Sequence, residues 1–216
     1  LINFIIMNIL ITSAGRRVSL IKAFKEASLK LKTKSKIFIT DLNTERSPAA
    51  YFADDSFNIG YFSDQNYIND LLKICLKNKV SIIIPTIDTE LIQLANSKSV
   101  FNAKGIDIIV SDLKLIKTLR DKITVNTFFN SLKIRTPIIY NKHNMRFPVF
   151  LKPLDGSNSR GVYKAENINE IKPSDLDSDN MMILENIDNT IYDEYTIDLY
   201  YDKNSILKCI VPRIRL

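Results

Sequence analysis

Histidine and cysteine are scarce in this chain of 216 residues, and their scarcity excludes several kinds of site. His143 is the only histidine, so catalysis by a pair of histidines is excluded. Cys75 and Cys209 lie far apart and outside any metal-ligand spacing, so neither a metal site nor a disulfide framework is expected. The apolar pattern of 71–76 predicts that Cys75 is buried, whereas the polar stretch around His143 predicts a surface loop. Free cysteines fit a reducing compartment, so a cytoplasmic location is expected.

Runs of like charge and long apolar runs are missing as well. The net charge is +6, but no five consecutive residues share a charge, and the lysines from Lys30 to Lys36 alternate with other residues. We therefore expect no nucleic-acid partner. The apolar start, Leu1–Ile6, is too short to span a membrane and carries no basic leader or cleavage site, so no membrane partner is expected. This segment either extends the first strand or precedes a natural start at Met7.

The first half of the chain alternates short apolar runs with amphipathic stretches. Such alternation predicts an α/β fold in which helices cover both faces of a parallel sheet. We expect a Rossmann-like domain over residues 1–111. The predicted strands are 8–12, 36–40, 80–84 and 106–110, and the predicted helices lie at about 20–31, 70–79 and 89–96.

The second half has more antiparallel character. A helical region is expected from a cap at Ser111 and Asp112 to about Leu132. The alternation of 194–202 predicts a strand with one buried and one polar face, joined to the next strand by a turn at 202–205. We expect an α+β domain over residues 112–216 that includes a subdomain at about 136–188. Its predicted strands are 148–153, 161–165, 181–185, 194–202 and 206–212.

The turn after the first strand contains Gly15, Arg16 and Arg17, and amides at a helix start favour anions. Asp41, after the second strand, suits either a ribose hydroxyl or a simple strand-end cap. The hypothesis of a nicotinamide-dependent oxidoreductase has this turn as its only support. The single glycine argues against it, because the dinucleotide motif has three.

The segment 85–90 follows the third predicted strand at an edge where open α/β sheets bind ligands. Asp88 and Glu90 are therefore candidate ligand contacts. Capping of the next helix by Thr86 or Asp88 explains the same pattern equally well.

The most informative region begins at Phe147. An apolar strand delivers Lys152, a loop of small polar residues follows, and a second strand begins at Gly161. Small residues let successive amides approach phosphate oxygens, and lysine adds a point charge. A later apolar strand ends in Glu185 with free backbone beyond it, which suits an adenine, and Glu194 suits ribose hydroxyls. A flexible hairpin loop and solvated strand ends are the alternative explanation.

The order of these features resembles the ATP-grasp superfamily. The resemblance extends over nearly the whole chain and is most evident to the large-subunit type of carbamoyl-phosphate synthase and to carboxylate–amine ligases. It implies that Lys122 and Lys152 contact phosphates, that Glu185 and Ile187 hold the adenine, and that Glu194 holds the ribose. It also implies a mobile loop over the phosphates formed by Gly156, Ser157, Ser159, Arg160 and Gly161. Arg213 and Arg215, like Gly15, Arg16, Asp88 and Glu90, are candidate substrate contacts.

One departure from the family pattern concerns its magnesium ligands. In the family these are an acid on a later strand and a Glu-x-Asn-Pro-Arg stretch, and the chain ends at Leu216 before either. The resemblance implies ATP, with Mg²⁺ in the full-length parent, and a small carboxylate or bicarbonate that is activated as an acyl phosphate. The alternative is a catalytically incomplete fragment that acts as a homodimer or with a complementing C-terminal chain.

Overall fold

The structure is a computed structural model, and it describes residues 6–154, 161–202 and 204–215. The chain divides into two compact units, Leu1–Arg120 and Asp121–Leu216. The predicted domain boundary after residue 111 stays a prediction.

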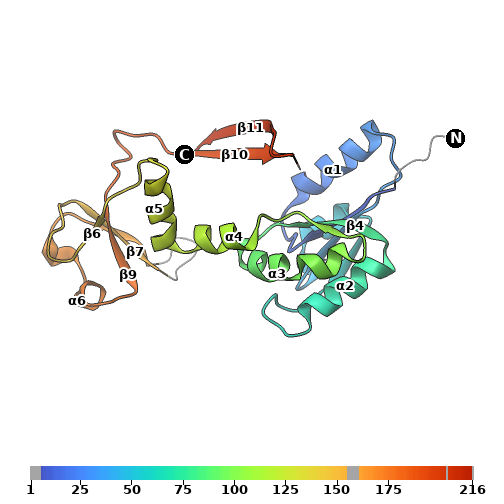
Figure 1. The fold of residues 1–216 in the computed structure, drawn as a ribbon, viewed down its shortest axis with the longest axis horizontal. Coiled ribbons are helices and arrows are strands. Elements are labelled where there is room, and N and C mark those ends of the chain that lie inside the picture. Colours follow the sequence, from blue (N-terminus) through green and yellow to red (C-terminus); the bar gives the residue numbers. More distant parts are fainter. Residues whose placement is uncertain (1–5, 155–160, 203, 216) are drawn as a thin grey trace. The chain divides into compact units, whose positions relative to one another are not determined.

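The first unit contains a five-stranded sheet, whose strand β4 is labelled in Figure 1. Every pairing in this sheet is parallel, and the strand order is β3-β2-β1-β4-β5. The predicted parallel sheet is therefore confirmed. Its central strands are apolar and rich in isoleucine because both of their faces are covered. The strands are β1 (Asn8–Thr12), β2 (Ile37–Asp41), β3 (Asp55–Asn58), β4 (Val80–Pro85) and β5 (Asp107–Ile108).

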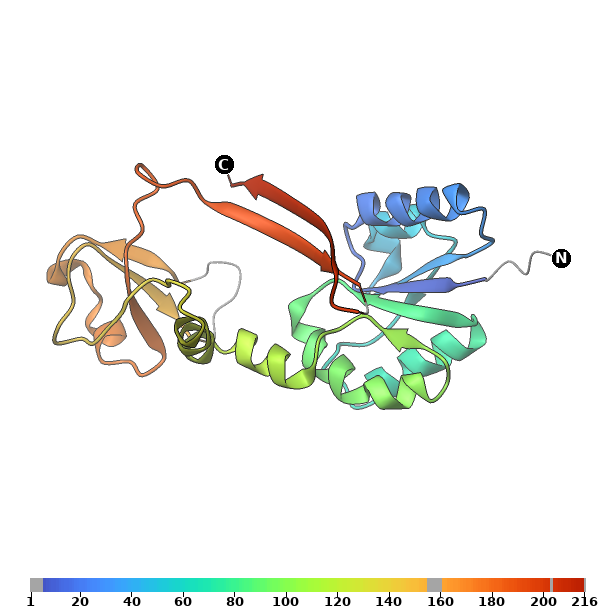
Figure 2. The ribbon, with the colours of Figure 1, turned by 45° about the horizontal axis from the view of Figure 1, so that its top comes forward.

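Helices cover both faces of this sheet, as Figure 2 shows. Ile21 of α1 packs on one face, in a core cluster with Ile11 and Ile39. Leu71 and Cys75 of α2 pack on the other face. The helices are α1 (Val18–Lys30), α2 (Tyr67–Lys77), α3 (Leu91–Asn102) and α4 (Leu113–Arg120), with 3-10 helices η1 (Thr44–Arg46), η2 (Pro48–Phe52) and η3 (Asp88–Glu90).

The predicted burial of Cys75 is confirmed, because its side chain has 0% exposure. Burial raises the pKa of the thiol from 9.0 to about 12. Between these two pKa values the folded state retains a proton that the unfolded chain releases. The thiol's contribution to stability is therefore fully present below pH 9.0 and declines as the pH rises toward about 12.

We expect this thiol to remove about 1.4 kcal/mol of unfolding free energy per pH unit within that window. The measurement is urea unfolding of the wild type and of Cys75→Ala at several pH values. The alanine variant carries a pH-independent cavity cost, so its stability should fall less steeply with pH. Parallel pH profiles for the two proteins would contradict the assignment.

The helical region predicted from 111 to 132 is two helices, α4 and α5 (Lys122–Ser131). Asp121 interrupts them because its extended backbone lets its Oδ1 accept hydrogen bonds from the amides of Ile123 at 3.1 Å and Thr124 at 2.6 Å. A hydrogen bond with the Thr124 side chain, followed by the two amide bonds, holds the pKa of Asp121 below its usual value. The residue therefore starts a new helix instead of continuing the first.

The second unit contains an antiparallel four-stranded sheet in the order β6-β9-β7-β8. Its core gathers Val149 and Leu151 of β7 with Ile183 of β9 and Ala165 of β8. His143 lies exposed in a turn beside this sheet, as predicted. The elements are β6 (Ile139–Tyr140), β7 (Val149–Pro153), β8 (Tyr163–Ala165), β9 (Met181–Glu185), the 3-10 helix η4 (Ile168–Glu170) and α6 (Pro173–Leu176).

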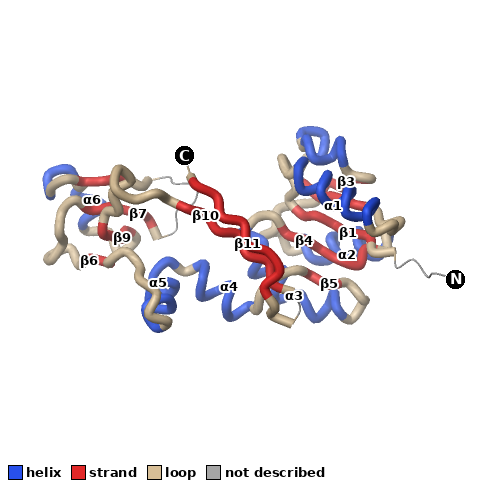
Figure 3. The backbone as a smooth tube through the Cα atoms, turned by 90° about the horizontal axis from the view of Figure 1, so that it is seen from above, coloured by secondary structure: helices blue, strands red, loops and turns tan. Residues whose placement is uncertain are grey.

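Strands β10 (Tyr195–Tyr201) and β11 (Leu207–Ile214) form the predicted antiparallel hairpin and lie side by side along their length (Figure 3). The expectation of one buried face is wrong. Every described residue of the hairpin strands is exposed except Thr196, which is half-buried. A two-stranded ribbon has no second layer of its own, so its alternation produces an apolar face that nothing in the described part of the second unit covers.

Across the described ranges, the structure contains no helix of the length and apolar character needed to cross a membrane.

Candidate functional site

The alternation of side chains along β7 separates two environments. Val149 and Leu151 point into the core of the second unit, where both have 0% exposure. Phe150 and Lys152 point to the opposite face, since successive strand residues alternate. Lys164 of β8 and Leu184 of β9 are the cross-strand partners of Phe150, so they share this second face.

This second face forms the floor of an open pocket of about 570 Å³. Its size lies within the range typical of small-molecule sites. The floor is partly apolar, through Phe150 and Leu184, and its rim is polar. The lining residues are Pro137, Phe150, Lys152, Lys164, Leu184, Glu185, Asn186, Ile187, Asp188, Asn189 and Glu194.

Four residues that the sequence singled out for one nucleotide line this one pocket: Lys152, Glu185, Ile187 and Glu194. Lys122 does not line it. Its Nζ donates a hydrogen bond to the carbonyl oxygen of Pro153, at the end of the strand that carries Lys152. The structure therefore brings Lys152, Glu185, Ile187 and Glu194 to the same pocket. Their roles in binding phosphate, adenine and ribose stay predictions.

The predicted phosphate loop falls mostly outside the described residues. Gly156, Ser157, Ser159 and Arg160 belong to the range 155–160, for which no structure is given. Gly161 is described and has a φ of +72°, in the left-handed region that glycine tolerates best. A Cβ atom at this position would lie 3.1 Å from Cγ of Pro153.

A Gly161→Ala substitution is expected to lower the unfolding free energy of the second unit by about 1–3 kcal/mol, from the φ penalty and the close contact. Gly105 offers a matched control, because its φ of +73° is similar and its Cβ would meet nothing within 4 Å. Gly105→Ala should therefore cost only the φ penalty, about 1 kcal/mol. Chemical denaturation measures both. Equal costs would show that Pro153 gives way without penalty.

The segment after β9 leaves backbone groups free at the pocket. The amide of Glu185 donates to the Ile138 carbonyl at 2.8 Å, and its Oε2 accepts from the Ile138 amide at 3.2 Å. Strand pairing ends there. In the described part of the chain, no hydrogen bond uses the backbone amide or carbonyl of Ile187. Such a pair of unused groups matches the donor and acceptor edge of an adenine.

The candidate residues Glu194, Arg213 and Arg215 are already engaged in ion pairs at the hairpin. Arg215 Nη1 lies 2.6 Å from Oε1 of Glu194, and Arg213 Nη2 lies 2.7 Å from Oδ2 of Asp198. All four side chains are more than half exposed, so these pairs add little stability. A ligand hydroxyl that binds Glu194 must share this carboxylate with Arg215.

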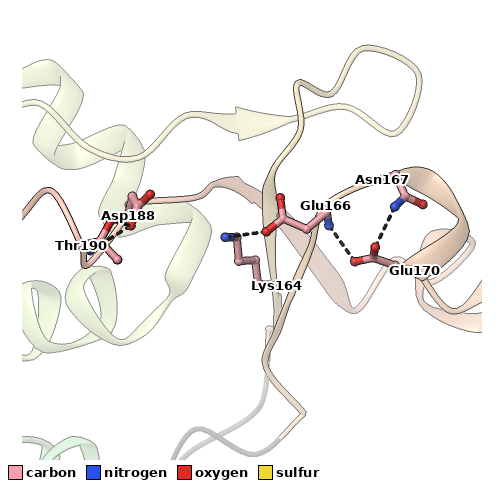
Figure 4. Close-up of polar contacts among 6 residues, drawn as sticks. All are labelled: Lys164, Glu166, Asn167, Glu170, Asp188 and Thr190. Carbon is pink, nitrogen blue, oxygen red and sulfur yellow. Dashed lines mark hydrogen bonds and ion pairs between the residues drawn. The ribbon is translucent and has the colours of Figure 1, made fainter.

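Lys164 is a pocket residue that the sequence reasoning missed. Its Nζ lies 2.7 Å from Oε1 of Glu166 (Figure 4). This hydrogen bond raises the pKa of Lys164; burial opposes it, and the charges of Glu166, Asp188 and Glu170 reinforce it. The lysine is therefore a cation at neutral pH beside Lys152. Its position opposite Phe150 follows only from the register of β7 with β8, which no sequence signal gave.

In the first unit, Asp41 at the end of β2 binds an amide of the turn after β1. The amide of Gly15 donates to Oδ2 of Asp41 at 2.6 Å, and that of Leu42 donates to Oδ1 at 2.7 Å. Asp41 is therefore a cap that occupies the Gly15 amide, one of the donors an anion would need. Arg16 is exposed and lines a separate depression with Thr86. Asp88 is also exposed and lies 3.6 Å from Nη1 of Arg120.

Glu90 is buried with 0% exposure. Its Oε1 accepts from the Thr12 hydroxyl at 2.8 Å, and its Oε2 accepts from the Tyr67 hydroxyl at 2.7 Å. The hydroxyl of Ser13 adds a longer bond of 3.4 Å. Burial, followed by the charge of Glu90, raises the pKa of Tyr67, which keeps this phenol protonated as a donor. In this conformation Glu90 joins β1, α2 and η3, and it presents no surface to a substrate.

Magnesium is the metal that the ATP-grasp resemblance implies, and the described residues do not provide a site for it. No group of three or more His, Cys, Asp or Glu residues lies together as metal ligands in ranges 6–154, 161–202 and 204–215.

Comparison with known proteins finds relatives that are similar to the first unit. Residues 9–109 match the family described as PylC-like, N-terminal domain. A carbamoyl-phosphate synthase from Methanobrevibacter smithii is 27% identical over 111 residues, which cover 46% of this chain and 30% of that protein.

Solved structures share the fold over both units. An L-amino acid ligase from Bacillus licheniformis has a TM-score of 0.64 at 14% identity and covers 96% of this chain. The biotin carboxylase of Campylobacter jejuni has a TM-score of 0.68 at 14% identity over 93% of this chain. The biotin carboxylase domain of Hydrogenobacter thermophilus 2-oxoglutarate carboxylase has a TM-score of 0.65 at 16% identity over 94%. The chain spans 49% of the length of each of these structures.

Proposed function

We propose that this chain, whose residues 9–109 match the PylC-like N-terminal domain family and whose fold is similar to those of an L-amino acid ligase and a biotin carboxylase, binds ATP in the pocket of its second unit. Lys152 would contact phosphates from the pocket floor, the backbone of Ile187 beside Glu185 would hold the adenine edge, and Glu194 would hold the ribose. Lys122 lies outside the pocket lining, bonded to the Pro153 carbonyl, and would contact phosphates that extend past the end of β7. Lys164 would add a second positive charge to the pocket floor.

The observation that carries this proposal is the convergence of Lys152, Glu185, Ile187 and Glu194 on one pocket. These residues come from β7, from the end of β9 and the segment after it, and from the position just before β10. These four residues were assigned to a single nucleotide from the order of their motifs along the sequence. A strand lysine, a backbone edge that no hydrogen bond uses in the described part of the chain, and a carboxylate therefore line the same pocket.

The proposed reaction of the whole protein is ligation through an acyl phosphate. An oxygen of a carboxylate or bicarbonate attacks the γ-phosphorus of ATP, and the bond from that phosphorus to ADP breaks. An amine or ammonia nitrogen then attacks the acyl carbon, and inorganic phosphate leaves. The Hydrogenobacter carboxylase domain was solved with MgADP, ADP and bicarbonate, which supports this substrate class for the present chain.

A second candidate is a nucleotide-binding chain that needs a partner for catalysis. The specific support is the hairpin, whose apolar residues Ile197, Leu199 and Ile210 are each more than half exposed. The described residues also lack a metal cluster. A second copy, or a complementing chain that supplies acidic ligands, would cover the hairpin. Light scattering tests the homodimer, and a monomeric mass over a wide concentration range would leave only the complementing chain.

A nicotinamide site receives no support from the first unit. The carboxylate of Asp41 occupies the Gly15 amide, where the pyrophosphate of a dinucleotide would need a free donor.

Calorimetric titration of the purified chain tests the proposal. ATP, with and without magnesium, is the probe, and NAD at the same concentration is the control. We expect saturable binding of ATP and none of NAD. Absence of ATP binding, or equal binding of NAD, would contradict the assigned site.

A further inference from the structure

The first unit contains a second pocket, which the proposed function does not use. It has a volume of about 230 Å³ and is lined by Ser13, Asp41, Ile59, Phe62, Tyr67 and Ile87, among others. It shares no lining residue with the nucleotide pocket of the second unit.

This pocket lies beyond the carboxyl ends of adjacent parallel strands. Ser13 follows β1, Asp41 ends β2, and Ile87 follows β4. Strand order runs outward in opposite directions from the β1–β4 pair, with β2 and β3 on one side and β5 on the other. Ligands of open α/β sheets bind at such a reversal point, outside the carboxyl ends of the strands.

Three of the polar side chains that line the pocket, those of Ser13, Asp41 and Tyr67, offer acceptors. Asp41 receives one backbone amide on each carboxylate oxygen, and each oxygen retains further lone pairs. The hydroxyls of Ser13 and Tyr67 both direct their hydrogens to Glu90. The Tyr67 oxygen is therefore left as an acceptor for a ligand, and the Ser13 oxygen can accept as well.

The remaining wall is apolar, through Ile59, Phe62 and Ile87. We propose that this pocket binds a small primary amine, whose ammonium group donates to Asp41 and the two hydroxyl oxygens while an apolar body packs against Phe62 and the isoleucines. Because the polar groups named above are acceptors, they favour a cation that carries several hydrogen-bond donors over an anion or a neutral acceptor. The volume is below the range of drug-sized sites, so the ligand has the dimensions of a small metabolite.

Isopentylamine and isopentanol are matched probes, because they have the same carbon skeleton and differ in the ammonium group. Titration of the ¹⁵N-labelled full chain, followed by NMR, locates binding through the amides of Ser13, Leu42, Ile59 and Phe62. We expect these amides to shift saturably with the amine, and the alcohol to bind at least about tenfold more weakly, because a hydrogen bond to a charged group is lost. Equal binding of the two probes, or shifts scattered over the surface, would overturn the proposal.

Two lysine substitutions sharpen the test. Ile87→Lys places an ammonium group on the chain at the rim of the pocket, where Ile87 is 36% exposed, and should abolish the amine-induced shifts. Leu29→Lys is the control, since Leu29 is 78% exposed, belongs to the same unit and does not line the pocket. It should leave amine binding unchanged. Amine binding that survives in Ile87→Lys would contradict the pocket assignment.

Asp41→Asn tests the charge itself. The variant should lose the preference for amine over alcohol, and its melting temperature reports whether the Gly15 turn has been disturbed. A folded variant that retains the preference would exclude Asp41 as the ammonium partner. If the variant unfolds, the comparison of Ile87→Lys with Leu29→Lys decides whether the amine binds in this pocket.

Discussion

A Lys152→Ala variant is expected to bind ATP about 10- to 100-fold more weakly than the wild type. The estimate follows from the loss of one charged hydrogen bond to phosphate, worth about 1.5–3 kcal/mol. Lys152 lines the pocket from β7, and its strand neighbours Leu151 and Val149 are fixed in the core, so the lysine is held by a rigid element. Calorimetry with ATP measures the effect.

Lys142→Ala is the matched control for this experiment. Lys142 is an exposed lysine of the same unit, lies 3.5 Å from Asp177 and does not line the nucleotide pocket. Both variants lower the net charge by one, so they change long-range attraction for ATP equally. A similar loss in the two variants would mean that ATP is attracted by overall charge, and the specific role of Lys152 would fail.

A Glu90→Ala variant should lose about 2–6 kcal/mol of unfolding free energy in the first unit. The substitution leaves the hydroxyls of Thr12 and Tyr67 without their acceptor, and these residues are 0% and 3% exposed. Each buried polar group left unpaired costs about 1–3 kcal/mol. Urea unfolding, followed by circular dichroism, measures the loss.

Asp88→Ala gives the contrast, since Asp88 lies two residues earlier in η3 and its side chain is 74% exposed. Its ion pair with Arg120 should contribute at most about 1 kcal/mol. If Glu90→Ala were as mild as Asp88→Ala, the buried hydroxyls would have found other partners, and the structural role assigned to Glu90 would be wrong.

Much of the fold could be predicted from the sequence because hydrophobic periodicity is strong. The runs at Asn8–Thr12, Val80–Pro85 and Met181–Glu185 are apolar over most of their length, and each is a strand of its sheet. Short elements were missed. β3 (Asp55–Asn58) has no apolar alternation, and β6 (Ile139–Tyr140) has two residues. Both are recognised as strands only because they pair with a neighbouring strand, β2 and β9 respectively.

Candidate site residues could be predicted where they stand at the end of an apolar strand in the sequence. They were missed where the pairing of two strands brings a residue into the pocket. Lys152 and Glu185 lie at the ends of apolar strands, which the sequence displays directly. Lys164 enters the pocket because it faces Phe150 across the β7–β8 pair. The burial of Glu90 beneath Tyr67 joins residues 23 positions apart, a tertiary contact that local pattern does not encode.

Photolabelling with 8-azido-ATP would locate the bound nucleotide within the chain, because the reactive group sits on the adenine ring. We expect the label, displaced by excess ATP, to attach to the segment from Glu185 to Glu194 or to the facing strand β7. Mass spectrometry of the digested chain identifies the site. Attachment that ATP displaces from the first unit alone, or attachment that ATP does not displace, would contradict a nucleotide site in the pocket of the second unit.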